Sequence, residues 1–189
     1  MKILLLDNYD SFTYNLADYL SRSGTEVEIV RNDAFSVETM DIRSFSGVVI
    51  SPGPSTPEKA GMLMPFLKKF SDEIPILGVC LGFQAIGVHF GARLIRGKEP
   101  VHGKSSEISC IQHPMYAHIP LRHRVGRYHS LCLEAIPHSL TLTATTADGV
   151  PMAFAHKSLP IWAVQYHPEA VYTEFGLQFI RNWVNSLKT

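Results

Sequence analysis

One segment of the sequence combines residue types and spacing suited to nucleophilic chemistry. Residues 75–84 read Pro-Ile-Leu-Gly-Val-Cys-Leu-Gly-Phe-Gln, an apolar strand followed by Gly-x-Cys-x-Gly and a helical pattern. A sharp strand-to-helix turn needs such glycines, because it crowds the neighbouring side chains. Cys80 would then lie at a helix N-terminus, which favours a thiolate, and the Leu81 N–H could stabilise an oxyanion. The alternative is a buried structural cysteine, which is our interpretation of Cys110 and Cys132.

A thiolate nucleophile needs a base and a group that orients the base. Among nine histidines, only His167 has a fitting context, because the apolar segment 161–165 delivers it to a strand end and Pro168 keeps it extended. Glu169 follows two residues later, close enough to hold the imidazole. The pattern predicts a catalytic triad of Cys80, His167 and Glu169; the alternative is a simple turn histidine. No His-x-x-x-His or Cys-x-x-Cys pair occurs, so we expect no metal site.

A third feature is a stiff loop that follows another apolar strand. Residues 51–57 read Ser-Pro-Gly-Pro-Ser-Thr-Pro, with three prolines and one glycine. Ligands of open α/β sheets bind at the carboxyl ends of the strands, where this loop would lie. A Gly53 N–H aimed at Cys80 would complete an oxyanion hole with Leu81, whereas the alternative is a rigid connection without a catalytic role.

The apolar patterning predicts the elements that must position these groups. The predicted strands are 3–6, 26–30, 48–50, 74–79, 105–111, 140–146, 152–156 and 161–165. The predicted helices are one capped by Ser11 and ending at Gly24, and those at 60–70, 81–90 and 174–187. Strands that are apolar at nearly every position are typical of a parallel sheet covered on both faces. We therefore predict an α/β fold with an open, mostly parallel sheet, flanking helices and a smaller antiparallel portion, in one domain spanning 1–189.

Composition excludes several classes of protein. The 189 residues include 17 Lys+Arg and 17 Asp+Glu, so no basic field is available to bind nucleic acid. Charged residues make up only 18%, below the usual ~25%, which leaves neutral surface for a partner. Three cysteines do not form a disulfide framework, the apolar run after Met1 is too short for a secretory signal, and no run reaches membrane-span length. We expect a cytoplasmic protein without membrane contact.

The three motifs resemble those of the class I (triad) glutamine amidotransferases, which hydrolyse glutamine to glutamate and ammonia. Gly-Val-Cys-Leu-Gly, Ser-Pro-Gly-Pro and His-Pro-Glu occur in the family's order and at about its spacing. Residues 6–16, 31–33, 102–105 and 126–131 are similar to the glutaminase subunit (component II) of anthranilate synthase and aminodeoxychorismate synthase. The resemblance covers residues 2–184, nearly the whole chain.

The resemblance implies a flavodoxin-like glutamine amidotransferase architecture and a role for each motif. Cys80 matches the nucleophile, His167 the base and Glu169 the orienting carboxylate, while Gly53 and Leu81 match the oxyanion-hole donors. The positions that match glutamine-binding residues are Pro52, Gly53, Pro54, Leu81, Gln84, Ser130 and Leu131. Without the resemblance, the residue patterns would not have indicated Gln84, Ser130 or Leu131 as glutamine-binding positions.

The resemblance also implies a partner. A separate synthase subunit (component I) would use chorismate and the ammonia, giving anthranilate for tryptophan biosynthesis, 4-amino-4-deoxychorismate for folate biosynthesis, or both. We expect no cofactor in this chain, since Mg²⁺ would belong to the synthase partner. Phe83 and Ala170 depart from the family pattern, where His and Ser are common, and we expect 148–156 to form a variable surface.

Two other classes of function use the same residues differently. A γ-glutamyl hydrolase, or a glutaminase with a different partner, would share the triad, but Asp-Asn-Tyr-Asp-Ser-Phe at 7–12 argues against both. A non-catalytic flavodoxin-like binding or regulatory module could hold Mg²⁺ with Asp7 and Asp10. That interpretation leaves Cys80, His167 and Glu169 without a function.

Overall fold

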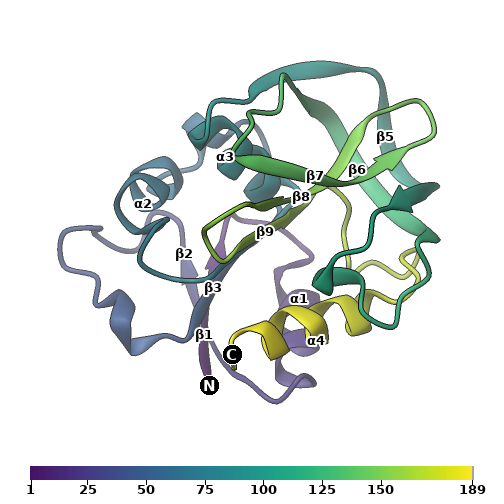
Figure 1. Ribbon diagram of the computed structural model, residues 1–189. Helices are drawn as coiled ribbons and strands as arrows, with labels where there is room; N and C mark the ends of the chain where they lie inside the picture. The colour runs from purple at the N-terminus through teal and green to yellow at the C-terminus, as the bar shows by residue number, and fades with distance from the viewer. Residues whose placement is uncertain (189) are drawn as a thin grey trace.

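A twisted sheet of nine strands forms the centre of the computed structural model, which describes residues 1–188 (Figure 1). The strand order across the sheet is β2-β1-β3-β4-β9-β8-β7-β5-β6. The strands from β2 to β9 in this order run parallel, and β8, β7, β5 and β6 continue the sheet in antiparallel pairs. The predicted α/β class, with an open parallel sheet and an antiparallel portion, is confirmed.

The parallel strands are β1 (Lys2–Asp7), β2 (Glu26–Arg31), β3 (Gly47–Ile50), β4 (Ile76–Val79) and β9 (Ile161–Val164). β3 and β4 are buried at every position and β1 at all but its first residue. Their continuous apolar sequences suit a sheet that is covered on both faces. Because these strands point the same way, the loops that follow them meet at one edge of the sheet.

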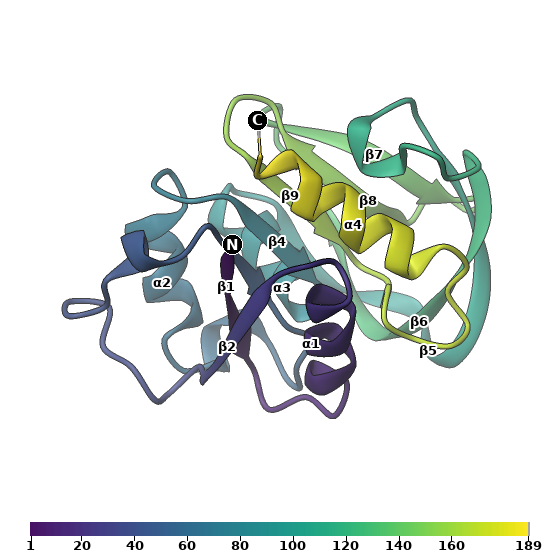
Figure 2. The same cartoon turned by 90° about the horizontal axis from the view of Figure 1, so that it is seen from below.

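Helices cover both faces of the parallel part of the sheet (Figure 2). α1 (Thr13–Ser21) and α4 (Gly176–Ser186) pack on one face, and α2 (Leu63–Phe70) and α3 (Leu81–His89) on the other. Each pair of helices shares one apolar core with the sheet. Trp183 of α4, for example, lies fully buried in the core that α1 and α4 form with the sheet. Three short 3₁₀ helices lie at Ile42–Ser44, Pro57–Lys59 and Pro114–Tyr116. Among residues 1–188, no helix is long and apolar enough to cross a membrane.

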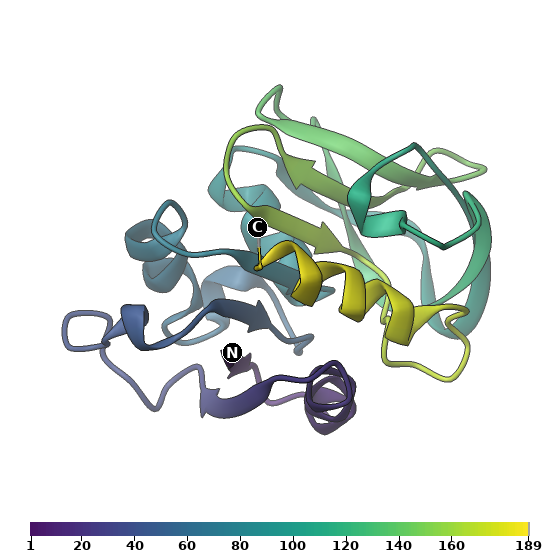
Figure 3. The ribbon, with the colours of Figure 1, turned by 60° about the horizontal axis from the view of Figure 1, so that its bottom comes forward.

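The antiparallel strands extend the sheet beyond β9, at the end opposite α2 (Figure 3). β8 (Pro151–His156) pairs with β9 and with β7 (Leu140–Thr146). The two longest strands, β5 (Arg93–Cys110) and β6 (Arg122–Glu134), pair with each other, and their register shifts between residues 96 and 101. Because of this long pairing, β6 lies near the carboxyl ends of the parallel strands, where Gly126 pairs with His167.

Two predicted helix starts are wrong. Ser11 does not cap α1, which begins after Phe12 without a side-chain cap. The helix predicted from Ala60 begins only at Leu63, because Gly61 has a φ of 53° and interrupts helical backbone before that residue.

One strand was predicted only in part, and another was missed. The sequence prediction found only the end of β5, at 105–111, and missed β6, because polar and charged residues fill the exposed positions of both strands. Only part of segment 148–156 forms the expected surface. Residues 152–155 are buried in β8, and only the turn at 147–149 is exposed.

Candidate active site

Cys80 occupies the turn between β4 and α3 in a backbone conformation that few residues with a side chain adopt. Its φ is 51° and its ψ is −96°, a strain of about 1–3 kcal/mol. A Cβ on Gly78 would lie 2.7 Å from the Gly82 backbone, and a Cβ on Gly82 would lie 2.6 Å from the Ile50 carbonyl oxygen. The Cys80 N–H donates to the Val164 carbonyl at 2.8 Å. Close backbone approach therefore requires both glycines, and β9 fixes the turn.

His167 follows β9, and both its backbone N–H and its backbone carbonyl are held by hydrogen bonds. Its N–H donates to the Gly126 carbonyl at 3.1 Å, and the Thr173 hydroxyl donates to its carbonyl at 2.5 Å. The backbone turns immediately afterwards, since the Ala170 N–H donates to the same carbonyl at 3.2 Å. This turn brings the Glu169 carboxylate back to the ring, where its Oε1 lies 2.7 Å from Nδ1, with both side chains buried.

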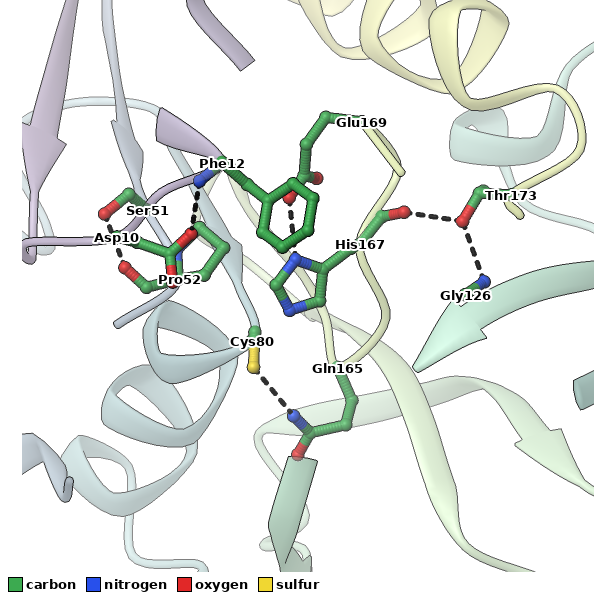
Figure 4. A network of polar contacts seen from close by, with 10 residues as sticks. All are labelled: Asp10, Phe12, Ser51, Pro52, Cys80, Gly126, Gln165, His167, Glu169 and Thr173. Atoms are coloured by element: carbon green, nitrogen blue, oxygen red, sulfur yellow. Dashed lines mark hydrogen bonds and ion pairs between the residues drawn. The ribbon is translucent and has the colours of Figure 1, made fainter. Parts of the chain in front are cut away.

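The charge state of His167 follows from its neighbours. Burial lowers the pKa of His167, but the neighbouring Cys80 and Glu169 favour the charged ring, outweigh burial and raise the pKa to about 10. The ring is therefore an imidazolium at neutral pH. Its Nε2 is buried and has no hydrogen-bond partner within residues 1–188, and Figure 4 shows the ring between Glu169 and Cys80. A cationic ring beside a thiol is the arrangement that activates cysteine nucleophiles.

Cys80 and His167 line one cavity of about 390 Å³. Its other walls come from residues 9–12 after β1, residues 52–54 after β3, and the β5–β6 pair. The walls therefore combine the loops at the carboxyl edge of the parallel sheet with side chains of the antiparallel extension. The volume lies within the range of small-molecule sites.

The loop after β3 brings Gly53 against the Cys80 turn. A Cβ on Gly53 would lie 2.6 Å from the Asn8 Cβ and 2.8 Å from Leu81 Cδ2, so a larger residue does not fit. The Asn8 N–H donates to Ser51 Oγ at 2.8 Å, and its side-chain amide donates to the Ser51 carbonyl at 3.0 Å. Gly53 and Leu81, the predicted oxyanion-hole donors, are therefore neighbours in space.

The remaining predicted glutamine-binding residues form a separate group. Gln84 lies one turn after Cys80 on α3, is buried, and donates through Nε2 to the Leu131 carbonyl at 3.4 Å. Ser130, beside Leu131 on β6, is exposed. The structure thus places Gln84 and Leu131 together but outside the lining of the 390 Å³ cavity.

Sequence reasoning missed three side chains around the Cys80–His167 pair. The ring centroids of Phe12 and Tyr128 lie 5.4 and 5.0 Å from that of His167. Gln165 Nε2 lies 3.7 Å from the Cys80 sulfur. Phe12 and Tyr128 come from distant segments, whereas the signal for Gln165 was its position directly after β9 and two residues before His167.

Asp7 and Asp10, the alternative Mg²⁺ ligands, are engaged by their own loop. Asp7 Oδ1 accepts hydrogen bonds from the Tyr9 and Asp10 N–H groups and from the Thr13 hydroxyl, and Asp10 Oδ1 accepts from the Phe12 N–H. In the part of the chain that the structure describes, no three His, Cys, Asp or Glu side chains are grouped to hold a metal ion. These carboxylates shape a wall of the cavity.

Comparison with known proteins decides the family. The model of the class-I glutamine amidotransferases matches residues 4–187. The chain belongs to this family. The amidotransferase is 41% identical to anthranilate synthase component 2 of Azospirillum brasilense, over 98% of this chain and 96% of that protein. It is 40% identical to aminodeoxychorismate/anthranilate synthase component 2 of Bacillus subtilis, over 98% and 97%. A crystal structure assigned to a GMP synthase subunit of Thermoplasma acidophilum has a TM-score of 0.88 at 28% identity, covering 100% of this chain and 94% of that one.

The two departures of this amidotransferase from the family pattern lie in packed positions. Phe83 faces the core from α3, fully buried, with its ring centroid 4.7 Å from that of Phe154. Ala170 is buried, and a Cβ on Gly126 would lie 3.2 Å from the Ala170 Cβ. Both residues are therefore accommodated by packing around the site and not by contacts within the cavity.

Proposed function

We propose that this amidotransferase is the glutaminase subunit (component II) of anthranilate synthase, aminodeoxychorismate synthase or both. In this proposal Cys80 is the nucleophile, His167 is the general acid and base, and Glu169 orients His167. One observation carries the proposal. Cys80, held at φ 51° on a helix N-terminus, lines the same cavity as His167. The His167 ring is buried against Glu169, and its Nε2 has no hydrogen-bond partner among residues 1–188. We treat residues 1–189 as one glutamine amidotransferase domain.

The reaction follows from these groups. The Cys80 thiolate attacks the side-chain amide carbon of glutamine, forming a carbon–sulfur bond, and the carbonyl electron pair moves onto oxygen. The imidazolium of His167 gives its Nε2 proton to the nitrogen as the carbon–nitrogen bond breaks, releasing ammonia and leaving a γ-glutamyl thioester. Neutral His167 then takes a proton from water, and the hydroxide displaces the sulfur. Glutamate leaves, and the thiolate–imidazolium pair is restored.

The oxyanion of both steps would rest on the N–H groups of Gly53 and Leu81. Their adjacency in space supports this role, because donors fixed in a dry site stabilise a developing charge without reorganising. We further assign glutamine binding to Pro52, Gly53, Pro54, Leu81, Gln84, Ser130 and Leu131. The first three residues line the cavity, and Leu131 is joined to Gln84 by a hydrogen bond.

A separate synthase subunit would receive the ammonia. Ammonia reacts as a nucleophile only while unprotonated, so it must reach the second site through a shielded path. The relatives named component 2 support an assembly of two different chains. Apolar side chains also stand exposed beside the site: Tyr9, which lines the cavity, is 50% exposed, and Val171 and Tyr172, just after the triad, are 89% and 53% exposed. Such a surface suits a protein partner.

We propose that this chain carries no cofactor of its own and that Mg²⁺ belongs to the synthase partner. The chain's own residues supply every proton transfer of the reaction above. The cytoplasm is the proposed compartment, in keeping with three cysteines that are all free thiols.

The test is release of glutamate from glutamine by the purified chain, alone and with each candidate synthase subunit. We expect release to rise with the true partner, which thereby identifies the pathway. Cys80→Ala should abolish glutamine use while the complex still works with added ammonium, and Cys110→Ala, a matched control away from the cavity, should keep it. Retained glutamine use in Cys80→Ala would exclude the proposal. Release that no synthase stimulates would favour a glutaminase or γ-glutamyl hydrolase with another partner or substrate.

A further inference from the structure

Gln165 places a buried amide against the nucleophile. It follows β9 directly, is fully buried, and its N–H donates to the Met152 carbonyl at 2.8 Å. Its side-chain Nε2 lies 3.7 Å from the Cys80 sulfur, and Figure 4 shows the amide directed at that sulfur. The catalytic steps derived above assign Gln165 no role, yet it is the amide in contact with the reacting atom.

A second glutamine fixes which end of the Gln165 amide faces the sulfur. Gln84 Nε2 donates both to the Leu131 carbonyl at 3.4 Å and to Gln165 Oε1 at 3.2 Å. Because a backbone carbonyl can only accept, Gln84 must present its NH₂ group to Leu131. The same NH₂ group then selects the oxygen of Gln165. The NH₂ group of Gln165 is left to face Cys80, so its orientation follows from its partners.

The Leu131 carbonyl also links these glutamines to a buried histidine and an arginine. His129 Nε2 lies 3.0 Å from Arg127 Nε, which can only donate, so the single proton of neutral His129 sits on Nδ1. That proton is donated to the Leu131 carbonyl at 2.9 Å. Burial and the Arg127 charge lower the pKa of His129 to about 4, so the ring stays neutral. A connected set of hydrogen bonds therefore joins Arg127 to Cys80, and within it His129 and Gln84 both donate to the Leu131 carbonyl.

We propose that Gln165 is a further catalytic residue: its amide donates a hydrogen bond to the Cys80 sulfur, favours the thiolate over the thiol, and holds the sulfur toward the cavity. The inference rests on the proposed role of Cys80 as nucleophile. A donor gains more from an ionised acceptor than from a neutral one, so the contact is stronger once the sulfur loses its proton. Gln165 and His167, two residues apart in the segment that follows β9, thus both lie beside Cys80.

The test uses two variants of similar size and a matched control. Gln165→Met removes the donor, and Gln165→Glu replaces it with an acceptor. Gln178→Met removes an amide on α4 that donates to Asn182 Oδ1. Iodoacetamide alkylation of the Cys80 peptide is followed by mass spectrometry across pH. We expect the midpoint of the alkylation profile to rise by about one pH unit in Gln165→Met, as loss of a hydrogen bond to a charged group predicts, and further in Gln165→Glu.

A second readout separates chemistry from packing. In Gln165→Met, the acid limb of the kcat/KM profile for glutamine should move up by the same shift as the alkylation midpoint, about one pH unit, because both follow the thiolate fraction. An alkylation midpoint equal to that of the unsubstituted chain, with or without lost activity, would overturn the inference. Alkylation needs no glutamine, so a shifted midpoint in a chain that releases no glutamate would refute the proposed function and leave the Gln165 contact supported. If Gln165→Met fails to unfold cooperatively, Gln165→Glu carries the same test.

Discussion

Glu169→Gln isolates the contribution of one charge to the state of His167. The substitution keeps the shape of the side chain and an oxygen that can accept from Nδ1, which now lies 2.7 Å from the carboxylate. It removes only the negative charge that favours the imidazolium. Because the Cys80 sulfur remains in place, part of the raised His167 pKa should survive.

The expected shift in the His167 pKa follows from the free energies of hydrogen bonds to charged and to neutral groups. A hydrogen bond to a charged group contributes about 1.5–3 kcal/mol, against about 0.5–1.5 kcal/mol for a neutral pair. The difference of roughly 1–2 kcal/mol corresponds to about one pKa unit, and the loss of Coulomb attraction in a buried site adds to it. Starting from about 10, the pKa of His167 should fall to about 8–9 in the variant. The sign is fixed, since removing an anion always favours the neutral ring.

The assay follows the His167 Cε1 proton by NMR across pH, with His167→Asn to assign the signal. In parallel, the alkaline limb of kcat/KM for glutamine should move to lower pH, because the leaving nitrogen needs the imidazolium proton. Glu174→Gln is the matched control, since Glu174 accepts from the Arg124 N–H at the surface and its loss should leave the His167 signal unchanged. A His167 pKa that is equal in Glu169→Gln and the unsubstituted chain would refute this reasoning.

Two further substitutions test the packing that shapes the site. Gly78→Ala places a Cβ 2.7 Å from the Gly82 backbone, which no rotamer change can relieve, so we expect urea unfolding to show about 1–3 kcal/mol of destabilisation. The control is Gly149→Ala, whose Cβ would have nothing within 4 Å and which should show only backbone strain. Equal losses of unfolding free energy in the two variants would contradict the steric argument. Phe83→His puts an imidazole into a fully apolar site against Phe154 and should lower the free energy of unfolding by about 1–3 kcal/mol. Phe83→Leu should lower it by less than about 1.5 kcal/mol. A His variant more stable than the unsubstituted chain in thermal unfolding would show that a polar partner exists at this position.

Much of the parallel half of the fold could be predicted from local patterns. The continuous apolar runs of β1, β3 and β4 and the glycines beside Cys80 each reflect a constraint that acts within a few residues. The same holds for the His167–Glu169 contact, because the turn after Pro168 joins two residues that are close in sequence. The fold class and the family followed from these local signals.

The rest depends on contacts between distant segments. β6 was missed because its alternating polar residues lie on an exposed face, and its position is set by pairing with β5 and by the bridge between Gly126 and His167. Tyr128 reaches His167 only through that pairing. Gln165 meets Cys80 because β4 and β9 lie side by side in the sheet, although 85 residues separate the two side chains in sequence.

The most direct test of the central claim is covalent labelling of Cys80 by a glutamine analogue that carries an electrophilic carbon at the position of the amide. The labelled protein is digested, and each cysteine peptide is weighed by mass spectrometry. We predict a mass gain on the Cys80 peptide that excess glutamine prevents and that His167→Asn slows, with Cys110 and Cys132 unlabelled. Labelling spread over all three cysteines, or labelling of Cys80 that glutamine does not prevent, would contradict the assignment of Cys80 as the nucleophile that attacks glutamine.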